Sequence, residues 1–168
     1  MSPRAPVTAV YPGTFDPITL GHMDLMARGA RLFDRLVVAV AVGHHKRTMF
    51  TLEERLDMAR EVADGHANVT VEPFDGLLTQ FLARIDAQVV LRGVRTTSDC
   101  DYEFQMAGMN RRLMPSMDTV FLTPGATLQH ISATFVREIA TLGGDVSGLV
   151  APSVFQRVMA RVGRSTSA

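Results

Sequence analysis

At 168 residues the chain is long enough for one well-buried core and short for two, so we expect a single domain spanning residues 1–168. Its 17 basic and 17 acidic residues cancel, which leaves no basic field to attract a nucleic acid as partner. The apolar runs are shorter than the roughly 18 to 20 residues that span a bilayer, and the first six residues are too short and polar for a signal peptide. With a single cysteine, Cys100, the composition fits a reducing compartment, and we expect a cytoplasmic protein with no membrane partner.

Short apolar runs alternate with amphipathic segments along the chain. Five runs predict strands that are covered on both faces, at Val7–Tyr11, Leu36–Val42, Val69–Glu72, Val89–Arg92 and Thr119–Leu122. Because strands and helices alternate throughout, the sequence predicts an α/β fold of Rossmann-like type: an open parallel five-stranded sheet with helices on both faces.

Six amphipathic segments predict helices between and after these strands. The first carries an apolar stripe at Leu25, Met26, Gly29, Leu32 and Phe33, and the second opens with a capping box from Thr51 to Glu54. A shorter helix is predicted over Leu77–Ile85. Later stripes lie at Tyr102, Met106, Met109 and Leu113, then at Phe135, Ile139 and Ala140, and Pro152 marks the start of the last helix. We expect residues 164–168 to form a frayed tail.

In an open parallel sheet, ligands bind beyond the carboxyl ends of the strands, and the unusual residues of this chain follow its predicted strands. The first predicted strand leads into a turn rich in Gly, Pro and Asp, which opens a helix with His22 in its first turn. The unpaired N–H groups of such a helix start favour a phosphate, and an imidazole there adds a donor. The alternative is a turn of ordinary turn-forming residues with a surface histidine.

The loops after the second and third predicted strands contain fewer candidate functional residues. Lys46, the only lysine among the basic residues, follows the second strand. It is either a functional residue, because a compact ammonium differs from a guanidinium in size and hydration, or part of a solvated basic loop. The segment from Phe74 to Leu78 follows the third strand, and we interpret most of it as a turn and a hydrophobic helix start.

The last two predicted strands lead into further candidate phosphate sites. Arg92 and Arg95 flank a glycine and a valine after the fourth strand, and they either recognise phosphate or pair with the acidic residues that follow. The segment Leu128–Thr134 follows the fifth strand, and Ser132 is a candidate N-cap for the next helix.

These motifs resemble those of the nucleotidyltransferase superfamily, and within it the phosphopantetheine adenylyltransferase family. The resemblance rests on Gly13-Thr14-Phe15-Asp16, Thr19-Leu20-Gly21-His22, the stretch from Lys46 through Met49-Phe50 to Arg55, and Arg92-Gly93-Val94-Arg95 followed by Tyr102-Glu103. It covers nearly the whole chain, from Val7 to about Val162. It implies transfer of an adenylyl group from ATP to 4′-phosphopantetheine, giving dephospho-coenzyme A and pyrophosphate.

The resemblance also implies roles for particular residues. It makes His22 the stabiliser of the transition state, and it assigns phosphopantetheine to Thr14, Lys46, Leu78 and Arg92. It assigns ATP to Thr14, Phe15, His22, Gly93, Val94, Arg95, Glu103, Leu128, Gln129, His130, Ile131, Ser132, Ala133 and Thr134. Ala133 departs from the family pattern, which has a hydroxyl residue there.

The expected cofactor is Mg²⁺, held mainly by substrate phosphates and water, since no dedicated set of metal-binding carboxylates is evident in the sequence. The resemblance further implies a homo-oligomer, a hexamer, for which the helix over residues 102–114 offers a contact surface. Coenzyme A is a candidate feedback ligand.

The sequence leaves other functions open. The chain could transfer a nucleotidyl group to another acceptor, such as nicotinate mononucleotide, or could be a cytidylyltransferase; Thr19, Lys46 and the Arg92–Glu103 block argue against both. It could be a nucleotide sensor without catalysis, although a sensor has no use for a positioned acceptor phosphate. A tRNA-synthetase fragment should carry a lysine-rich second motif, which this chain lacks.

Overall fold

The computed structural model describes residues 5–43 and 47–163. The expected phosphate contact Lys46 and the expected frayed tail 164–168 lie outside the described residues.

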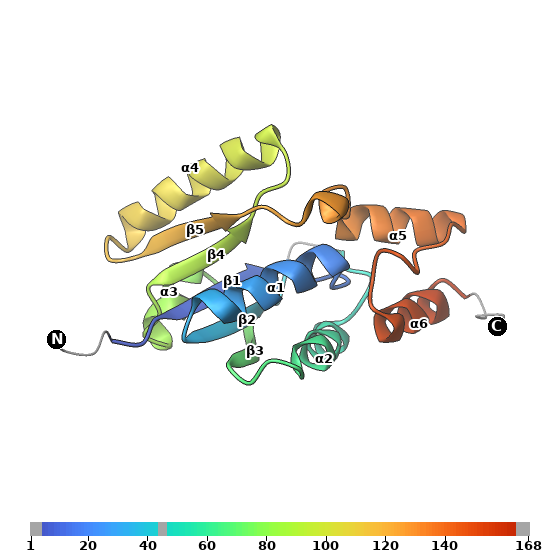
Figure 1. Cartoon of the computed structure of the whole chain (residues 1–168), viewed down its shortest axis with the longest axis horizontal. Helices are drawn as coiled ribbons and strands as arrows, with labels where there is room; N and C mark the ends of the chain where they lie inside the picture. Colours follow the sequence, from blue (N-terminus) through green and yellow to red (C-terminus); the bar gives the residue numbers. More distant parts are fainter. Residues whose placement is uncertain (1–4, 44–46, 164–168) are drawn as a thin grey trace.

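A single five-stranded parallel sheet forms the centre of the molecule (Figure 1). Its strands lie in the order β3-β2-β1-β4-β5, and the bounds are β1 Thr8–Gly13, β2 Arg35–Ala41, β3 Val69–Phe74, β4 Val89–Gly93 and β5 Asp118–Leu122. All five predicted strands are confirmed, as is the Rossmann-like α/β fold. The chain reverses its direction of winding beside β1, between β1 and β4, so the carboxyl ends of these two strands border the crevice where ligands bind in such sheets.

The helices lie between and after the strands, as the sequence predicts. Their bounds are α1 Leu20–Leu32, α2 Leu52–Ala63, α3 Leu78–Arg84, α4 Thr97–Leu113, α5 Ala133–Leu142 and α6 Pro152–Arg161, with a short 3₁₀ turn at Ala126–Leu128. Thr51 and Glu54 form the expected capping box, Ser132 caps α5, and Pro152 occupies the first turn of α6. In the described part of the chain, no helix combines the length and the apolar character that crossing a membrane would need.

Alternate residues of the central strands face two separate apolar cores. Tyr11 and Val38 face a core that is completed by α1, α2, α5 and α6. Val10 and Val37 face the opposite core, which is completed by Phe81 and Leu82 of α3 and by the residues that follow α4. This two-residue period confirms that helices cover both faces of the sheet.

The apolar stripes of three helices are buried to different extents. On α1, Leu25, Met26 and Gly29 are buried, but Leu32, at the last position of the helix where the chain leaves for β2, is exposed. On α5, Phe135 is exposed while Ala140 is buried. On α4 the whole stripe, Tyr102, Met106, Met109 and Leu113, is exposed, because the helix turns Glu103 rather than its methionines toward the sheet.

Candidate active site

A cleft of about 290 Å³ lies at the carboxyl edge of the sheet. The ends of β1 and β4, the first turn of α1, the first turn of α4 and the start of α5 enclose it. Its lining residues are Tyr11, Pro12, Gly13, Phe15, Thr19, Gly21, His22, Leu25, Arg92, Gly93, Arg95, Asp99, Glu103, Pro124, Ile131, Ser132, Ala133 and Thr134. The first, fourth and fifth of the predicted ligand loops therefore meet in one cavity.

The turn after β1 places an aromatic ring beneath the histidine. Phe15 is 2% exposed and has φ +50°, a left-handed backbone that a bulky side chain adopts only when its surroundings hold it there. Its ring stands edge-on to His22 at 5.1 Å and edge-on to Tyr11 at 5.3 Å. A side chain at Gly13 would collide with this ring, since a Cβ there would lie 2.8 Å from it. The turn is therefore built to fix the imidazole.

His22 is the third residue of α1, and its ring takes the place of the Glu or Gln of an ordinary capping box. The backbone N–H of Thr19 donates to His22 Nδ1 at 3.0 Å, so Nδ1 is an acceptor and the ring proton sits on Nε2. Burial, followed by the charges of Arg95 and Arg92, lowers the pKa of His22 to about 4. At neutral pH the cleft thus contains an uncharged imidazole with one N–H to donate.

Both arginines of the β4 loop line the cleft, and each also pairs with an acidic residue. Arg92 donates through Nε and Nη2 to the carboxylate of Glu103, and through Nη1 to the Pro12 carbonyl at 2.9 Å. Arg95 lies 3.3 Å from Asp99 and donates to the Ile131 carbonyl at 3.2 Å. The pairing that the sequence left open is therefore present. It orients both guanidinium groups at the wall of the cleft.

The start of α5 forms a further wall of the cleft, beside the loop that follows β4. Ser132 Oγ accepts from the N–H of Phe135 at 3.1 Å, and Ser132, Ala133 and Thr134 all line the cavity. The N–H groups of this first helical turn add positive potential to that of the α1 start. Ala133 contributes backbone there in place of a hydroxyl.

Some of the expected site residues do not line this cleft. Val94 is buried and its N–H bonds the Leu122 carbonyl. The residues Thr14, Leu128, Gln129 and His130 are also absent from the lining. Leu78 lines a second cavity of about 120 Å³, which borders the first because both include Arg92 and Glu103.

Other lining residues were not among the expected site residues. Asp99 could have been found from its spacing, because it follows Arg95 by one helical turn. Thr19 was named only for its motif, although its position three residues before His22 is that of an N-cap. Tyr11 and Pro12 precede the turn that carries the resemblance, whereas Leu25 and Pro124 give no signal in the sequence beyond their apolar character.

The fold and the cleft at its carboxyl edge are those of a nucleotidyltransferase, and residues 10–139 match the model of the cytidylyltransferase-like family. The structure of Plasmodium falciparum nicotinic acid mononucleotide adenylyltransferase complexed with NaAD shares this fold, with a TM-score of 0.68 at 12% identity over 97% of this chain and 100% of that one. The phosphopantetheine adenylyltransferase of Acidovorax sp. (strain JS42) is 56% identical over 164 residues, 98% of this chain and 99% of the relative. That of Janthinobacterium sp. (strain Marseille) is 59% identical over 148 residues, 88% and 92% of the two chains. The chain therefore belongs to the phosphopantetheine adenylyltransferase family, and it is an enzyme of the nucleotidyltransferase class.

Proposed function

We propose that this protein transfers the adenylyl group of ATP to 4′-phosphopantetheine, releasing pyrophosphate and forming dephospho-coenzyme A in coenzyme A biosynthesis. One observation carries the proposal: a neutral imidazole, two oriented guanidinium groups and two helix starts meet in a single cleft. The names of relatives that are 56% to 59% identical support the choice of acceptor.

The chemistry that such a cleft supports is direct transfer. The attacking group is already an anionic phosphate, so a side-chain nucleophile and a strong general base are both unnecessary. Catalysis then consists of holding two anions in line and stabilising the charge that develops on the α-phosphoryl group. We propose that the Nε2–H of His22 donates to that group in the transition state. Its low pKa supports this role, since the ring enters the reaction uncharged with its donor fixed by Thr19.

ATP would occupy the side of the cleft formed by α5 and the end of β4. There Arg95 and the first turn of α5, Ser132 to Thr134, would bind the β- and γ-phosphates that leave as pyrophosphate. Phe15, Gly93 and Glu103 also line the cleft, and we propose them as further ATP contacts. We propose Val94, Leu128, Gln129, His130 and Ile131 as the further nucleotide contacts, made by the segments that border the cleft.

The acceptor would approach from the side of Arg92. This guanidinium borders both cavities, so it can bind the acceptor phosphate while the pantetheine arm lies toward Leu78. Thr14 and Lys46 complete the proposed phosphate contacts, and Lys46 lies outside the described residues. Substitution of Lys46 by alanine should mainly weaken phosphopantetheine affinity, and an unchanged Kd would remove it from the site.

We propose Mg²⁺ as the cofactor, entering with ATP. Among the described residues, no group of three or more His, Cys, Asp or Glu side chains forms a metal site, and the cleft's carboxylates, Asp99 and Glu103, pair with arginines. This donor set supports a metal ion that is held by phosphate oxygens and water and that screens the triphosphate charge.

We also propose that the enzyme is a cytoplasmic homohexamer. The exposed apolar stripe of α4 supports assembly, and the scarcity of cysteine supports a reducing compartment. Coenzyme A contains the phosphopantetheine arm of the acceptor, which supports it as a feedback ligand at the same site.

Pyrophosphate release from ATP tests the proposal when it is measured with a panel of acceptors. We expect turnover with 4′-phosphopantetheine and at most a small fraction of that rate with nicotinate mononucleotide. Replacing ATP by CTP should also abolish most of the rate. Equal or faster turnover with the other acceptor would overturn the assignment, and binding of ATP without turnover would favour a sensor.

A further inference from the structure

Asp16, the residue after Phe15, is a buried carboxylate that holds a different segment of the chain. It is 3% exposed, and it does not line the cleft. Its Oδ2 accepts from the N–H of Met49 at 2.8 Å, and its Oδ1 accepts from the N–H of Phe50 at 2.9 Å. Both carboxylate oxygens therefore bind the backbone just before α2, at the end of the loop that in sequence contains Lys46.

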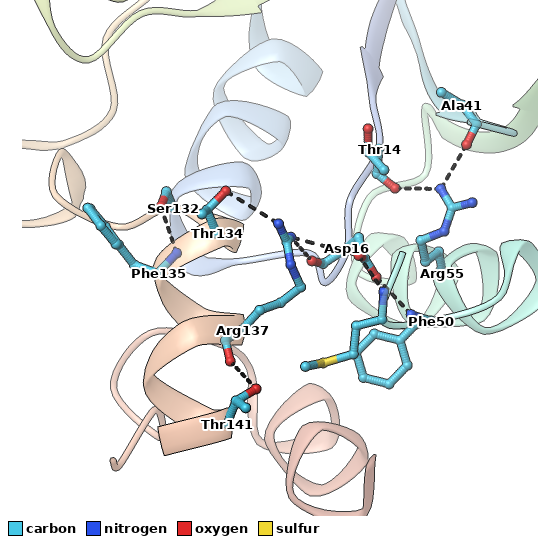
Figure 2. A network of polar contacts seen from close by, with 11 residues as sticks. Thr14, Asp16, Ala41, Phe50, Arg55, Ser132, Thr134, Phe135, Arg137 and Thr141 are labelled. Carbon is cyan, nitrogen blue, oxygen red and sulfur yellow. Dashed lines mark hydrogen bonds and ion pairs between the residues drawn. The ribbon is translucent and has the colours of Figure 1, made fainter. Parts of the chain in front are cut away.

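Arg137 ties the same aspartate to the helix that closes the cleft. It lies in the second turn of α5, where its Nη1 donates to the Asp16 carbonyl at 2.5 Å and lies 3.7 Å from Oδ2. Its Nη2 donates to Thr134 Oγ1 at 3.4 Å. Figure 2 shows the guanidinium reaching in both directions, to Asp16 and to the start of α5.

A second guanidinium supports the turn from the other side. Arg55 of α2 is 1% exposed, and its Nη1 donates to the carbonyls of Thr14 and Ala41, each at 2.7 Å (Figure 2). Its Nη2 donates to the Val42 carbonyl at 3.2 Å. Burial lowers the pKa of Arg55, and the nearby charge of Asp16 partly offsets this by raising it. Arg55 thus joins the turn after β1 to the end of β2.

These contacts connect three segments that reach the site from distant parts of the sequence: the turn 14–16, the two ends of the loop 41–50, and the start of α5. A buried charge is costly to leave unpaired, so a network of this kind permits few alternative arrangements. In the proposed reaction the α5 side holds the triphosphate and the loop after β2 holds the acceptor. The network therefore lies where it would fix the distance between the two substrates.

We propose that Asp16 and Arg137 are positioning residues, which set the triphosphate side of the cleft in register with the acceptor side so that the two phosphates meet in line. The proposal rests on the proposed function. Neither residue lines the cleft, although Arg137 contacts Thr134, which does, so we expect each substrate to keep most of its own contacts when the network is broken. What changes is their relative placement, and an error of about 1 Å there can cost on the order of 10²-fold in rate.

Asp16→Asn is the sharpest variant, because it keeps the size of the side chain. An amide offers one acceptor in place of two, so one of the two bonded N–H groups loses its partner, and the charge facing both arginines disappears. We expect kcat for pyrophosphate release to fall at least tenfold, while calorimetric Kd values for ATP alone and for phosphopantetheine alone stay within about threefold of wild type. Asp57→Asn, which breaks an exposed pair with Arg60, is the matched control and should leave all three values unchanged.

Variants of Arg137 provide the test if Asp16→Asn does not fold. The Arg137 side chain is 31% exposed, so its replacement should destabilise the fold less. Arg137→Gln should show the same fall in kcat with retained binding. Arg137→Lys should recover part of the rate, because an ammonium can still donate to the Asp16 carbonyl. Arg60→Gln serves as its control.

Three results would overturn the proposal. Wild-type kcat in the folded Arg137→Gln variant would show that the network does not set the reacting geometry. A loss of both binding affinities in parallel with kcat, without recovery in Arg137→Lys, would indicate a purely structural role. Absence of turnover in the wild-type protein would overturn the proposed function and the positioning role together. If the wild-type protein is active and the variants have an unchanged kcat, only the positioning role is refuted.

Discussion

The imidazole of His22 accepts from Thr19, packs against Phe15 and faces two arginines, so at the scale of single residues its chemistry is unusually constrained. We expect His22→Ala to lower kcat by on the order of 10²-fold or more, because a preorganised donor to the developing charge is lost. His22→Gln is the informative companion, since glutamine can keep the capping box of α1 while it removes the ring. Steady-state kinetics on both variants check this, with His66→Ala as the control. Near-normal turnover in either His22 variant would exclude the assigned role.

The low pKa of His22 gives a second expectation. Unfolded, this histidine titrates near 6.5, and in the folded protein near 4, so the unfolded chain binds the proton first as the pH falls. The contribution of His22 to the unfolding free energy is therefore complete above about pH 6.5 and is lost progressively toward pH 4. The loss should be on the order of 2–3 kcal/mol.

Nuclear magnetic resonance of the ring protons measures that pKa directly in the protein without ligands. A midpoint below about 5 is expected, and His22→Gln should lack the corresponding part of the pH dependence of stability. A midpoint near 6.5 would contradict the lowered pKa and the effect of burial on this ring.

The sequence was enough to select His22 as a candidate site residue. A histidine in the first turn of a helix that follows a strand is recognisable from neighbouring residues alone. Its charge state could not be predicted in the same way. That state depends on burial and on Arg92 and Arg95, which lie about 70 residues away and reach the ring only through the pairing of β1 with β4. Lys46 was selected by its uniqueness, and its role stays a prediction.

At the scale of the elements, α1 packs closely against the sheet at Gly29. A Cβ at Gly29 would lie 2.8 Å from Leu91 and 3.1 Å from Leu36, and both leucines are completely buried, so neither has room to move. Gly108 of α4 has nothing within 4 Å of the same position. Both glycines are in helix interiors, so replacement by alanine gives both the same gain in helix propensity.

We therefore expect Gly108→Ala to raise the unfolding free energy by about 0.5–1 kcal/mol. The unfolding free energy of Gly29→Ala should be about 1–3 kcal/mol lower than that of Gly108→Ala, because the added methyl group overpacks the core. Chemical denaturation of the two variants measures this difference. If both variants were stabilised equally, the close approach of α1 to the sheet would be wrong.

The strands and helix caps could be predicted because they depend on neighbouring residues, whereas the burial of an apolar helix stripe does not. A capping box such as Thr51 to Glu54, or an apolar run such as that of β2, forms from neighbours in the sequence. Whether an apolar stripe is buried depends on what lies opposite it. The same stripe is buried at Leu25 and Met26 and exposed at Leu32, where the helix ends.

For the molecule as a whole, the most conspicuous surface is the α4 stripe, whose Tyr102, Met109 and Leu113 are each more than half exposed. Apolar side chains gathered on one exposed helix face favour contact with another protein, here a second copy of the chain. We expect Leu113→Lys to shift the protein to a smaller assembly in analytical ultracentrifugation. Leu142→Lys, at an equally apolar and more exposed position on α5, should not. A monomeric wild-type protein would contradict the proposed homohexamer.

In the proposed reaction, AMP passes directly from ATP to the phosphate of phosphopantetheine within one cleft. The stereochemical course at the α-phosphorus tests this most directly, using ATP with a chiral phosphorothioate at that position and analysing the dephospho-coenzyme A product. A single in-line displacement inverts the configuration, and inversion is the result we predict. Retention would reveal a covalent adenylyl-enzyme intermediate and would contradict the claim.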